Sequence, residues 1–131
     1  ELNPGLVRLG RKEIAEQKLN ANYVQSSVEN YLETVSLKAA DTVLLDPPRT
    51  GCDPKAMLVL GSSARKKVVY ISCEPTTLAR DLRLLKETAV KWGLSLRLET
   101  VQTLDMFPQI EHVETVVEFS IDKIDTHTTT H

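Results

Sequence analysis

The chain has 131 residues, of which 41% are hydrophobic and 26% charged; this balance predicts one globular domain and excludes a mainly disordered chain. Its net charge of −2 excludes a domain that binds nucleic acid through overall charge alone. Cys52 and Cys73 are too few for a disulfide framework and have no metal-ligand spacing. We therefore expect no metal site. Because neither an apolar span nor a signal peptide is visible, we expect a cytoplasmic, reducing location.

The first part of the chain predicts two helices and two strands. Pro4 suits the first turn of a helix that we expect to continue to about Asn20. A short strand is expected over residues 23–26 and a weak helix over residues 27–35. The continuous apolar run at residues 42–45 then predicts a strand that is buried on both faces.

The rest of the chain predicts three further strands and two further helices. The strongest helix starts at Pro75 and ends near Gly93, and its apolar residues recur with helical spacing. We expect a helix over residues 55–62, strands over residues 68–71, 94–104 and 113–119, and a frayed polar tail over residues 120–131.

Strands that alternate with helices of this length predict parallel βαβ units in an open α/β sheet. Ligands bind such sheets in the crevice at the carboxyl ends of the strands. Two predicted strands end in unusual sequences, Asp46-Pro47-Pro48-Arg49 and Ser72-Cys73-Glu74-Pro75. Both sequences would open into the same crevice if the two strands are neighbours.

Cys73 lies between a predicted strand and the first turn of a helix. The positive end of a helix dipole stabilises a thiolate, so Cys73 is a candidate nucleophile. A small buried side chain at a strand end is the alternative, because cysteine is often buried and inert. Cys52 has no comparable place in the pattern, and we interpret it as structural.

Three further polar residues and a histidine are candidates for the site. The two prolines after Asp46 fix the backbone, so Asp46 can accept from a ligand and Arg49 can offer its planar donor fork. Glu114 lies at the start of an apolar strand, where a carboxylate is costly unless it is paired or functional. His112 could tune Glu114 or contact a ligand. A proline-containing turn and an exposed loop are the alternatives.

In combination, these sequences resemble the RNA 5-methyluridine methyltransferases, which use S-adenosylmethionine. One family signature appears as Asp46-Pro47-Pro48-Arg49-Thr50-Gly51 followed by Tyr70-Ile71-Ser72-Cys73-Glu74-Pro75-Thr76-Thr77, and the other as Asp105 to Glu114. The similarity extends from Glu1 to about Phe119. Glu74 and Ile110 depart from the usual Asn and Ser or Thr, and Glu74 would disfavour a thiolate at Cys73 electrostatically.

The resemblance implies a role for each matched residue. Cys73 is the nucleophile that adds to C6 of uracil, Glu114 the base that removes the C5 proton, and Arg49 a residue needed for activity. Asp46 and Arg49 lie at the cofactor and substrate crevice, and His112 is a further substrate contact. Residues 77–82 and 104–108 look more like the ribosomal-RNA branch than the transfer-RNA branch, so the expected substrate is ribosomal RNA, with tRNA as the alternative.

The resemblance also implies where the chain lies in the family fold. Glu1 matches the acidic residue that binds the cofactor ribose at the end of the second strand. We therefore expect residues 1–119 to be the C-terminal part of a class I, Rossmann-like methyltransferase domain. The expected sheet is mostly parallel with an antiparallel C-terminal strand, and it lacks the first strand and the Gly-rich loop. The family's N-terminal RNA-binding region, and any iron–sulfur module within it, would be missing too. We also expect the isolated chain to bind S-adenosylmethionine weakly or not at all, and to dimerise through exposed strand edges.

Two other functions compete with this interpretation. Amino-methyltransferases also carry Asp-Pro-Pro or Asn-Pro-Pro after a strand, but they usually continue with an aromatic residue and need no cysteine. Arg49 and Cys73 argue against that class. Alternatively, the chain is a degenerate or truncated α/β module without activity of its own.

Overall fold

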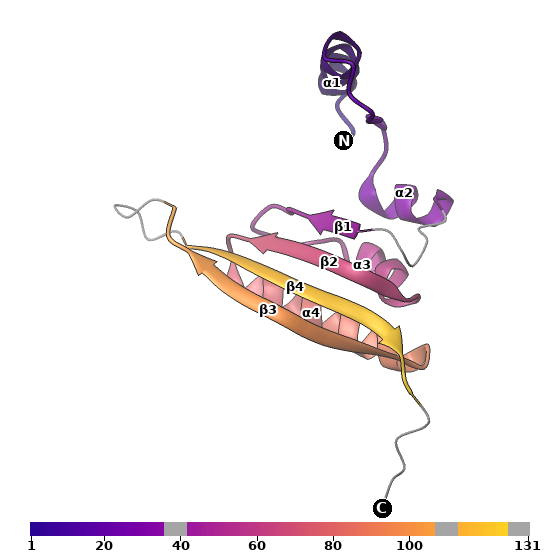
Figure 1. The fold of residues 1–131 in the computed structure, drawn as a ribbon, viewed down its shortest axis with the longest axis vertical. Coiled ribbons are helices and arrows are strands. Elements are labelled where there is room, and N and C mark those ends of the chain that lie inside the picture. Colours follow the sequence, from indigo (N-terminus) through magenta and orange to yellow (C-terminus); the bar gives the residue numbers. More distant parts are fainter. Residues whose placement is uncertain (36–41, 107–112, 126–131) are drawn as a thin grey trace, which may run out of the picture. The chain divides into compact units, whose positions relative to one another are not determined.

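A computed structural model describes residues 1–35, 42–106 and 113–125. Its contacts divide the chain into two compact units, Glu1–Ser36 and Leu37–His131, where the length predicted one domain (Figure 1). Within the described part of the chain, no helix has the length and hydropathy needed to cross a membrane. The same residues contain no cluster of three or more side chains suited to hold a metal ion.

The first unit begins with helix α1 (Pro4–Glu16), whose start is fixed by Asn3. The Asn3 side chain accepts hydrogen bonds from two backbone N–H groups of the first turn, as an N-cap residue does. The expected end near Asn20 is wrong. Lys18 has a positive φ of 53°, and the Leu19 N–H donates to the Ile14 carbonyl at 3.0 Å, which closes the helix earlier.

Helix α2 (Val28–Thr34) confirms the predicted weak helix, and the Ser27 side chain caps it by accepting from a backbone N–H. The strand expected at residues 23–26 is wrong, because these residues are not part of a sheet. Ser26 exchanges two backbone hydrogen bonds with Glu1, each 3.1 Å long. A β-strand needs backbone hydrogen bonds along several residues, whereas here only one pair of described residues is joined by them.

The second unit is built around a four-stranded sheet of order β1-β2-β4-β3. β2 pairs in parallel with β1, whereas β4 runs antiparallel to both β2 and β3. Three strands therefore point one way and only the C-terminal strand points the other way, which confirms the expected mixed α/β fold (Figure 1). The strands are β1 (Thr42–Leu45), β2 (Arg65–Ser72), β3 (Leu94–Leu104) and β4 (Glu114–Lys123). The expected end of the last strand at Phe119 is wrong, because residues 120–123 of the expected tail still belong to β4.

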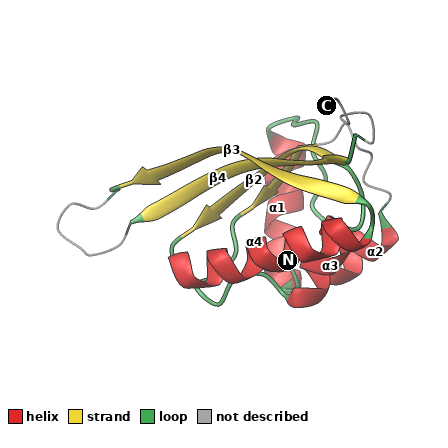
Figure 2. Cartoon of the chain, turned by 90° about the horizontal axis from the view of Figure 1, so that it is seen from below, coloured by secondary structure: helices red, strands yellow, loops and turns green. Residues whose placement is uncertain are grey.

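Helices α3 (Pro54–Gly61) and α4 (Pro75–Lys91) lie side by side against one face of this sheet (Figure 2). Both start with a proline, whose fixed φ suits the first helical turn. The core forms between these helices and the sheet, and its largest fully buried apolar or aromatic side chains are Tyr70, Phe119, Met57, Leu60, Leu85 and Ile121. Burial alternates along the final residues of β2 and the first residues of β4, so the opposite face of the sheet is only half-buried there.

Candidate active site

The ends of β1 and β2 lie beside each other, as the sequence predicted. Leu45, the last residue of β1, is in register with Tyr70 near the end of β2. Because the two strands are parallel, the segments that follow them leave the same edge of the sheet. Asp46 and Arg49 are exposed in the first segment, and Cys73 is half-buried in the second.

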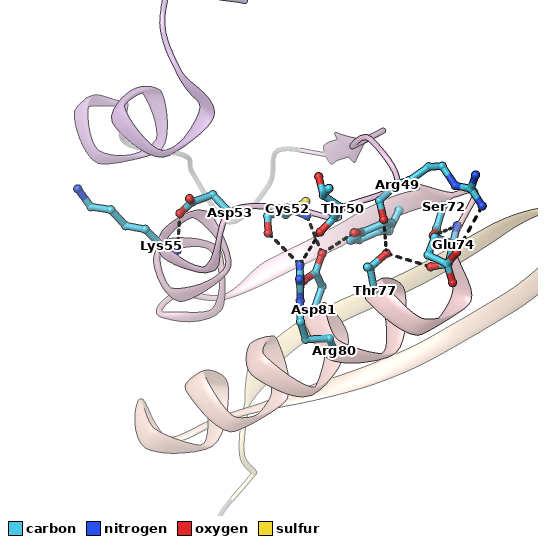
Figure 3. A network of polar contacts seen from close by, with 11 residues as sticks. Arg49, Thr50, Cys52, Asp53, Lys55, Ser72, Glu74, Thr77, Arg80 and Asp81 are labelled. Carbon is cyan, nitrogen blue, oxygen red and sulfur yellow. Dashed lines mark hydrogen bonds and ion pairs between the residues drawn. The ribbon is translucent and has the colours of Figure 1, made fainter.

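Residues 46–52, which we call the DPPR loop, contact the start of α4 through two polar interactions (Figure 3). The Thr77 hydroxyl donates to the Arg49 carbonyl at 3.0 Å. The guanidinium of Arg49 forms an ion pair with the Glu74 carboxylate, with 3.7 Å between the nitrogen and oxygen. The structure thus joins the two parts of the first signature that the chain separates by about twenty residues.

Glu74 has two partners in this arrangement. Its carboxylate accepts from the Thr76 N–H at 3.2 Å and so caps α4. This hydrogen bond is the main cause that lowers the pKa of Glu74, and the Arg49 guanidinium lowers it further. Glu74 is therefore ionised at neutral pH, and its negative charge beside Cys73 is partly balanced by Arg49 and by the helix N-terminus.

Cys73 directly follows β2, and Glu114 begins the neighbouring strand β4. Ser72, the last residue of β2, pairs with Thr115 of β4 in antiparallel register. Cys73 directly follows Ser72 and Glu114 directly precedes Thr115, so the two residues flank the last pair of this register. Ser72 and Thr115 are buried, whereas Cys73 and Glu114 are half-buried. The thiol is not sealed in the core.

The remaining predicted residues lie elsewhere or are not described. His112 lies outside the described residues, as does Ile110. Glu1 lies in the first unit, where it lines a hollow of about 290 Å³ together with Asn22, Val24, Ser26, Ser27, Val28 and Tyr31. One oxygen of its exposed carboxylate accepts from the Asn3 N–H at 2.7 Å. A carboxylate can accept further hydrogen bonds, and the hollow combines it with polar, apolar and aromatic side chains.

The sequence analysis missed Asp81, which is buried under the DPPR loop with an exposed fraction of 1%. Its carboxylate accepts from the Tyr70 hydroxyl at 2.6 Å and from the Cys52 N–H at 2.8 Å (Figure 3). A signal was present, because Asp81 lies three residues after Leu78 and four before Leu85, on the face of α4 that is otherwise apolar. A carboxylate on such a face indicates a buried polar contact.

The mixed sheet, the helices on one face and the site at the strand ends define an α/β fold of the methyltransferase type. The chain belongs to the family described as tRNA (uracil-5-)-methyltransferase, which it matches over residues 3–121.

Known proteins that resemble the chain agree with this family. An uncharacterized RNA methyltransferase of Bdellovibrio bacteriovorus is 42% identical over 93% of the chain. Another from Thermotoga maritima is 42% identical over 75% of it. The chain spans only 30% and 21% of these two proteins.

Among solved structures, the chain resembles the tRNA (uracil-54, C5)-methyltransferase of Pyrococcus abyssi in complex with S-adenosyl-L-homocysteine, with a TM-score of 0.72 and 31% identity. This match covers 91% of the chain and 27% of the solved protein. The methyltransferase fold that the sequence predicted is thereby confirmed.

Proposed function

We propose that the chain is the C-terminal catalytic part of an RNA (uracil-C5)-methyltransferase that uses S-adenosylmethionine. The observation that supports this proposal is the pairing of Ser72 with Thr115, because Cys73 directly follows Ser72 and Glu114 directly precedes Thr115. The reaction requires a nucleophile and a base that act on the same uracil ring, and these two residues flank the Ser72–Thr115 pair. An amino-methyltransferase needs no cysteine there.

In the proposed reaction, the Cys73 thiolate forms a bond to C6 of uracil. The electron pair of the C5–C6 double bond moves toward the C4 carbonyl, and C5 becomes nucleophilic. S-adenosylmethionine, when bound, supplies a methyl group on a positively charged sulfur for C5 to take. The Glu114 carboxylate then removes the proton from C5, the C5–C6 double bond re-forms, and the pair of the C6–S bond returns to the Cys73 sulfur.

Arg49 and Asp46 have supporting roles in this proposal. Both side chains are exposed at the edge of the sheet where the substrate would enter. A guanidinium can hold a uracil carbonyl oxygen while negative charge develops on it, and a carboxylate can accept from a ring N–H. The Glu1 carboxylate, by its place in the hollow of the first unit, is suited to accept from the ribose hydroxyls of the cofactor.

Two variants of the full-length protein, Cys73→Ala and Glu114→Gln, test the roles of the nucleophile and the base separately. Cys73→Ala should form neither 5-methyluridine nor a covalent complex with RNA. Glu114→Gln should still form the bond to C6 but should not release it, so a covalent complex with methylated RNA accumulates. Mass spectrometry of protein and RNA measures both outcomes. If Glu114→Gln released methylated RNA as fast as the unmodified protein, Glu114 would not be the base.

The kind of RNA that is methylated is a separate part of the proposal. We propose ribosomal RNA, from the sequence of residues 77–82 and 104–108, although the matched family and the solved relative are both described by tRNA. The full-length protein offered each RNA separately should methylate ribosomal RNA faster, and a preference for tRNA would overturn this part alone. A cytoplasmic location and dimerisation stay predictions.

A further inference from the structure

The DPPR loop is attached to α4 by an ion pair whose carboxylate, that of Asp81, is buried, whereas the Arg80 side chain is 45% exposed. Arg80 and Asp81 are neighbours on α4, and the Arg80 guanidinium donates to the Asp81 carboxylate at 2.7 and 3.0 Å. The same carboxylate accepts from the Tyr70 hydroxyl of β2 and from the Cys52 N–H at the end of the loop. A single buried carboxylate thus connects a helix, a strand and the DPPR loop (Figure 3).

Arg80 holds the loop from its carbonyl side. Its Nη2 atom donates to the Thr50 carbonyl at 3.0 Å and to the Cys52 carbonyl at 3.2 Å. Between these residues Gly51 has a φ of +78°, and a Cβ there would lie 2.6 Å from Nη2 of Arg80 and 2.7 Å from Oδ2 of Asp81. The backbone of the loop therefore lies directly against the ion pair, with no room for a side chain between them.

Three polar residues of α4 share this task. Arg80 and Asp81 lie three and four residues after Thr77, so both are on the same side of the helix as Thr77. Thr77 binds the Arg49 carbonyl, and the other two bind residues 50–52. The loop that carries Asp46 and Arg49 is thus fixed at several backbone groups by one turn of α4.

Stability alone gives a weak reason for such an arrangement. The ion pair itself contributes little net stability, because the exposed Arg80 side chain keeps part of its hydration and solvent screens its charge. It does impose a defined geometry on the groups it binds, since each hydrogen bond has a preferred distance and direction.

We infer that Arg80 and Asp81 are positioning residues, which hold the DPPR loop so that Arg49 and Asp46 meet the uracil ring in the geometry that methyl transfer requires. This inference rests on the proposed function. It adds two residues that do not themselves touch the substrate. A displacement of about 1 Å in such a site can lower the rate roughly 100-fold.

Arg80→Gln in the full-length protein tests this inference, with Arg83→Gln as the matched control. Arg83 is on the same helix, its side chain is 75% exposed, and its ion pair with Glu87 is at 4.0 Å. We expect Arg80→Gln to lower kcat roughly 10- to 100-fold while KM for RNA changes by less than about threefold. Arg83→Gln should keep kcat within about twofold of the unmodified protein. If Asp81→Asn folds, its kcat should fall as much as that of Arg80→Gln. If Asp81→Asn does not fold, the kcat of Arg80→Gln alone tests the inference.

Hydrogen exchange of the Cys52 amide gives a second measurement that does not depend on activity. This N–H donates to Asp81, so loosening the loop should speed its exchange in Arg80→Gln and leave it unchanged in Arg83→Gln. A kcat for Arg80→Gln equal to that of the control, or a lower kcat without faster Cys52 exchange, would overturn the inference. If the unmodified protein methylates no RNA, the proposed function fails, and the exchange at Cys52 alone decides whether the ion pair holds the loop.

Discussion

Individual residues fix the shape of the site through close contacts. Gly51 is the clearest case, because its positive φ and the two atoms beneath it both exclude a side chain. Gly93 provides a comparison, since its φ of +69° is similar but a Cβ there would meet nothing within 4 Å. Comparing Gly51 with Gly93 therefore separates two costs in the free energy of unfolding, that of the left-handed backbone conformation and that of a steric clash.

Gly51→Ala should destabilise the protein more than Gly93→Ala does. An L-residue in the left-handed region costs about 1–2 kcal/mol, and both variants incur this cost. Only Gly51→Ala also forces Arg80 or Asp81 to move. Urea unfolding of the full-length protein measures the difference, and equal losses in the two variants would show that the loop can shift away from α4 at no cost.

Glu74 gives a prediction about pH at the same scale. Its lowered pKa means that the carboxylate stabilises the fold above its ordinary pKa of 4.5, and that this contribution disappears as the pH falls through the lower folded value. Glu74→Gln should therefore lower the melting temperature at pH 7, with a difference that shrinks below about pH 4. A difference that stays constant from pH 7 to pH 3 would contradict the ion pair and the cap as its cause.

Most of the site residues could be predicted from the sequence, and their contacts could not. Cys73, Asp46 and Arg49 follow apolar runs that clearly end, so their place at the sheet edge was predictable. The hydrogen bonds of Asp81 depend on a residue of β2 and a loop that lie 11 and 29 residues before it. Nothing in local sequence spacing contains that information.

At the scale of elements, α4 carries both the core and the site. Its inward residues Leu78, Leu85 and Ala89 pack in the core, and Thr77, Arg80 and Asp81 contact the DPPR loop. The helix thereby couples the position of the loop to the packing of the sheet. Its start at Pro75 directly follows Cys73 and Glu74.

Leu85→Ala should cost about 2–5 kcal/mol, because the side chain is fully buried and its removal leaves a cavity. Leu58→Ala on α3 is the matched control, since Leu58 is 46% exposed, and it should cost less than about 1 kcal/mol. Denaturant unfolding measures both. A loss for Leu85→Ala as small as that of the control would mean that α4 is not packed on the sheet as described.

Element ends were harder to predict than elements. Strongly periodic segments such as α4 and the apolar run of β2 are specified by their own side chains. The early end of α1 depends on Lys18 in a conformation that favours glycine, which gave no sequence signal. The extension of β4 through residues 120–123 depends on pairing with β3, since Ser120, Ile121, Asp122 and Lys123 are each in register with a residue of that strand.

At the scale of the whole molecule, the strand order determines which motifs meet. β4 comes last in the chain but lies between β2 and β3, so Glu114 reaches the strand that ends before Cys73 although about forty residues separate them. This order brings a thiol from one motif and a carboxylate from another to the same edge of the sheet. The two signatures of the sequence predicted the family, and the strand order places β4, which begins at the end of the second signature, beside β2, which carries part of the first.

Full-length protein incubated with S-adenosylmethionine and RNA containing 5-fluorouridine gives the most direct test of the central claim. Fluorine at C5 cannot leave as a proton does, so the covalent intermediate should persist, and peptide mass spectrometry should locate the RNA on Cys73. Cys52→Ala should form the same adduct, and Cys73→Ala should form none. An adduct on Cys52, or no adduct in a protein that still methylates ordinary RNA, would contradict the account.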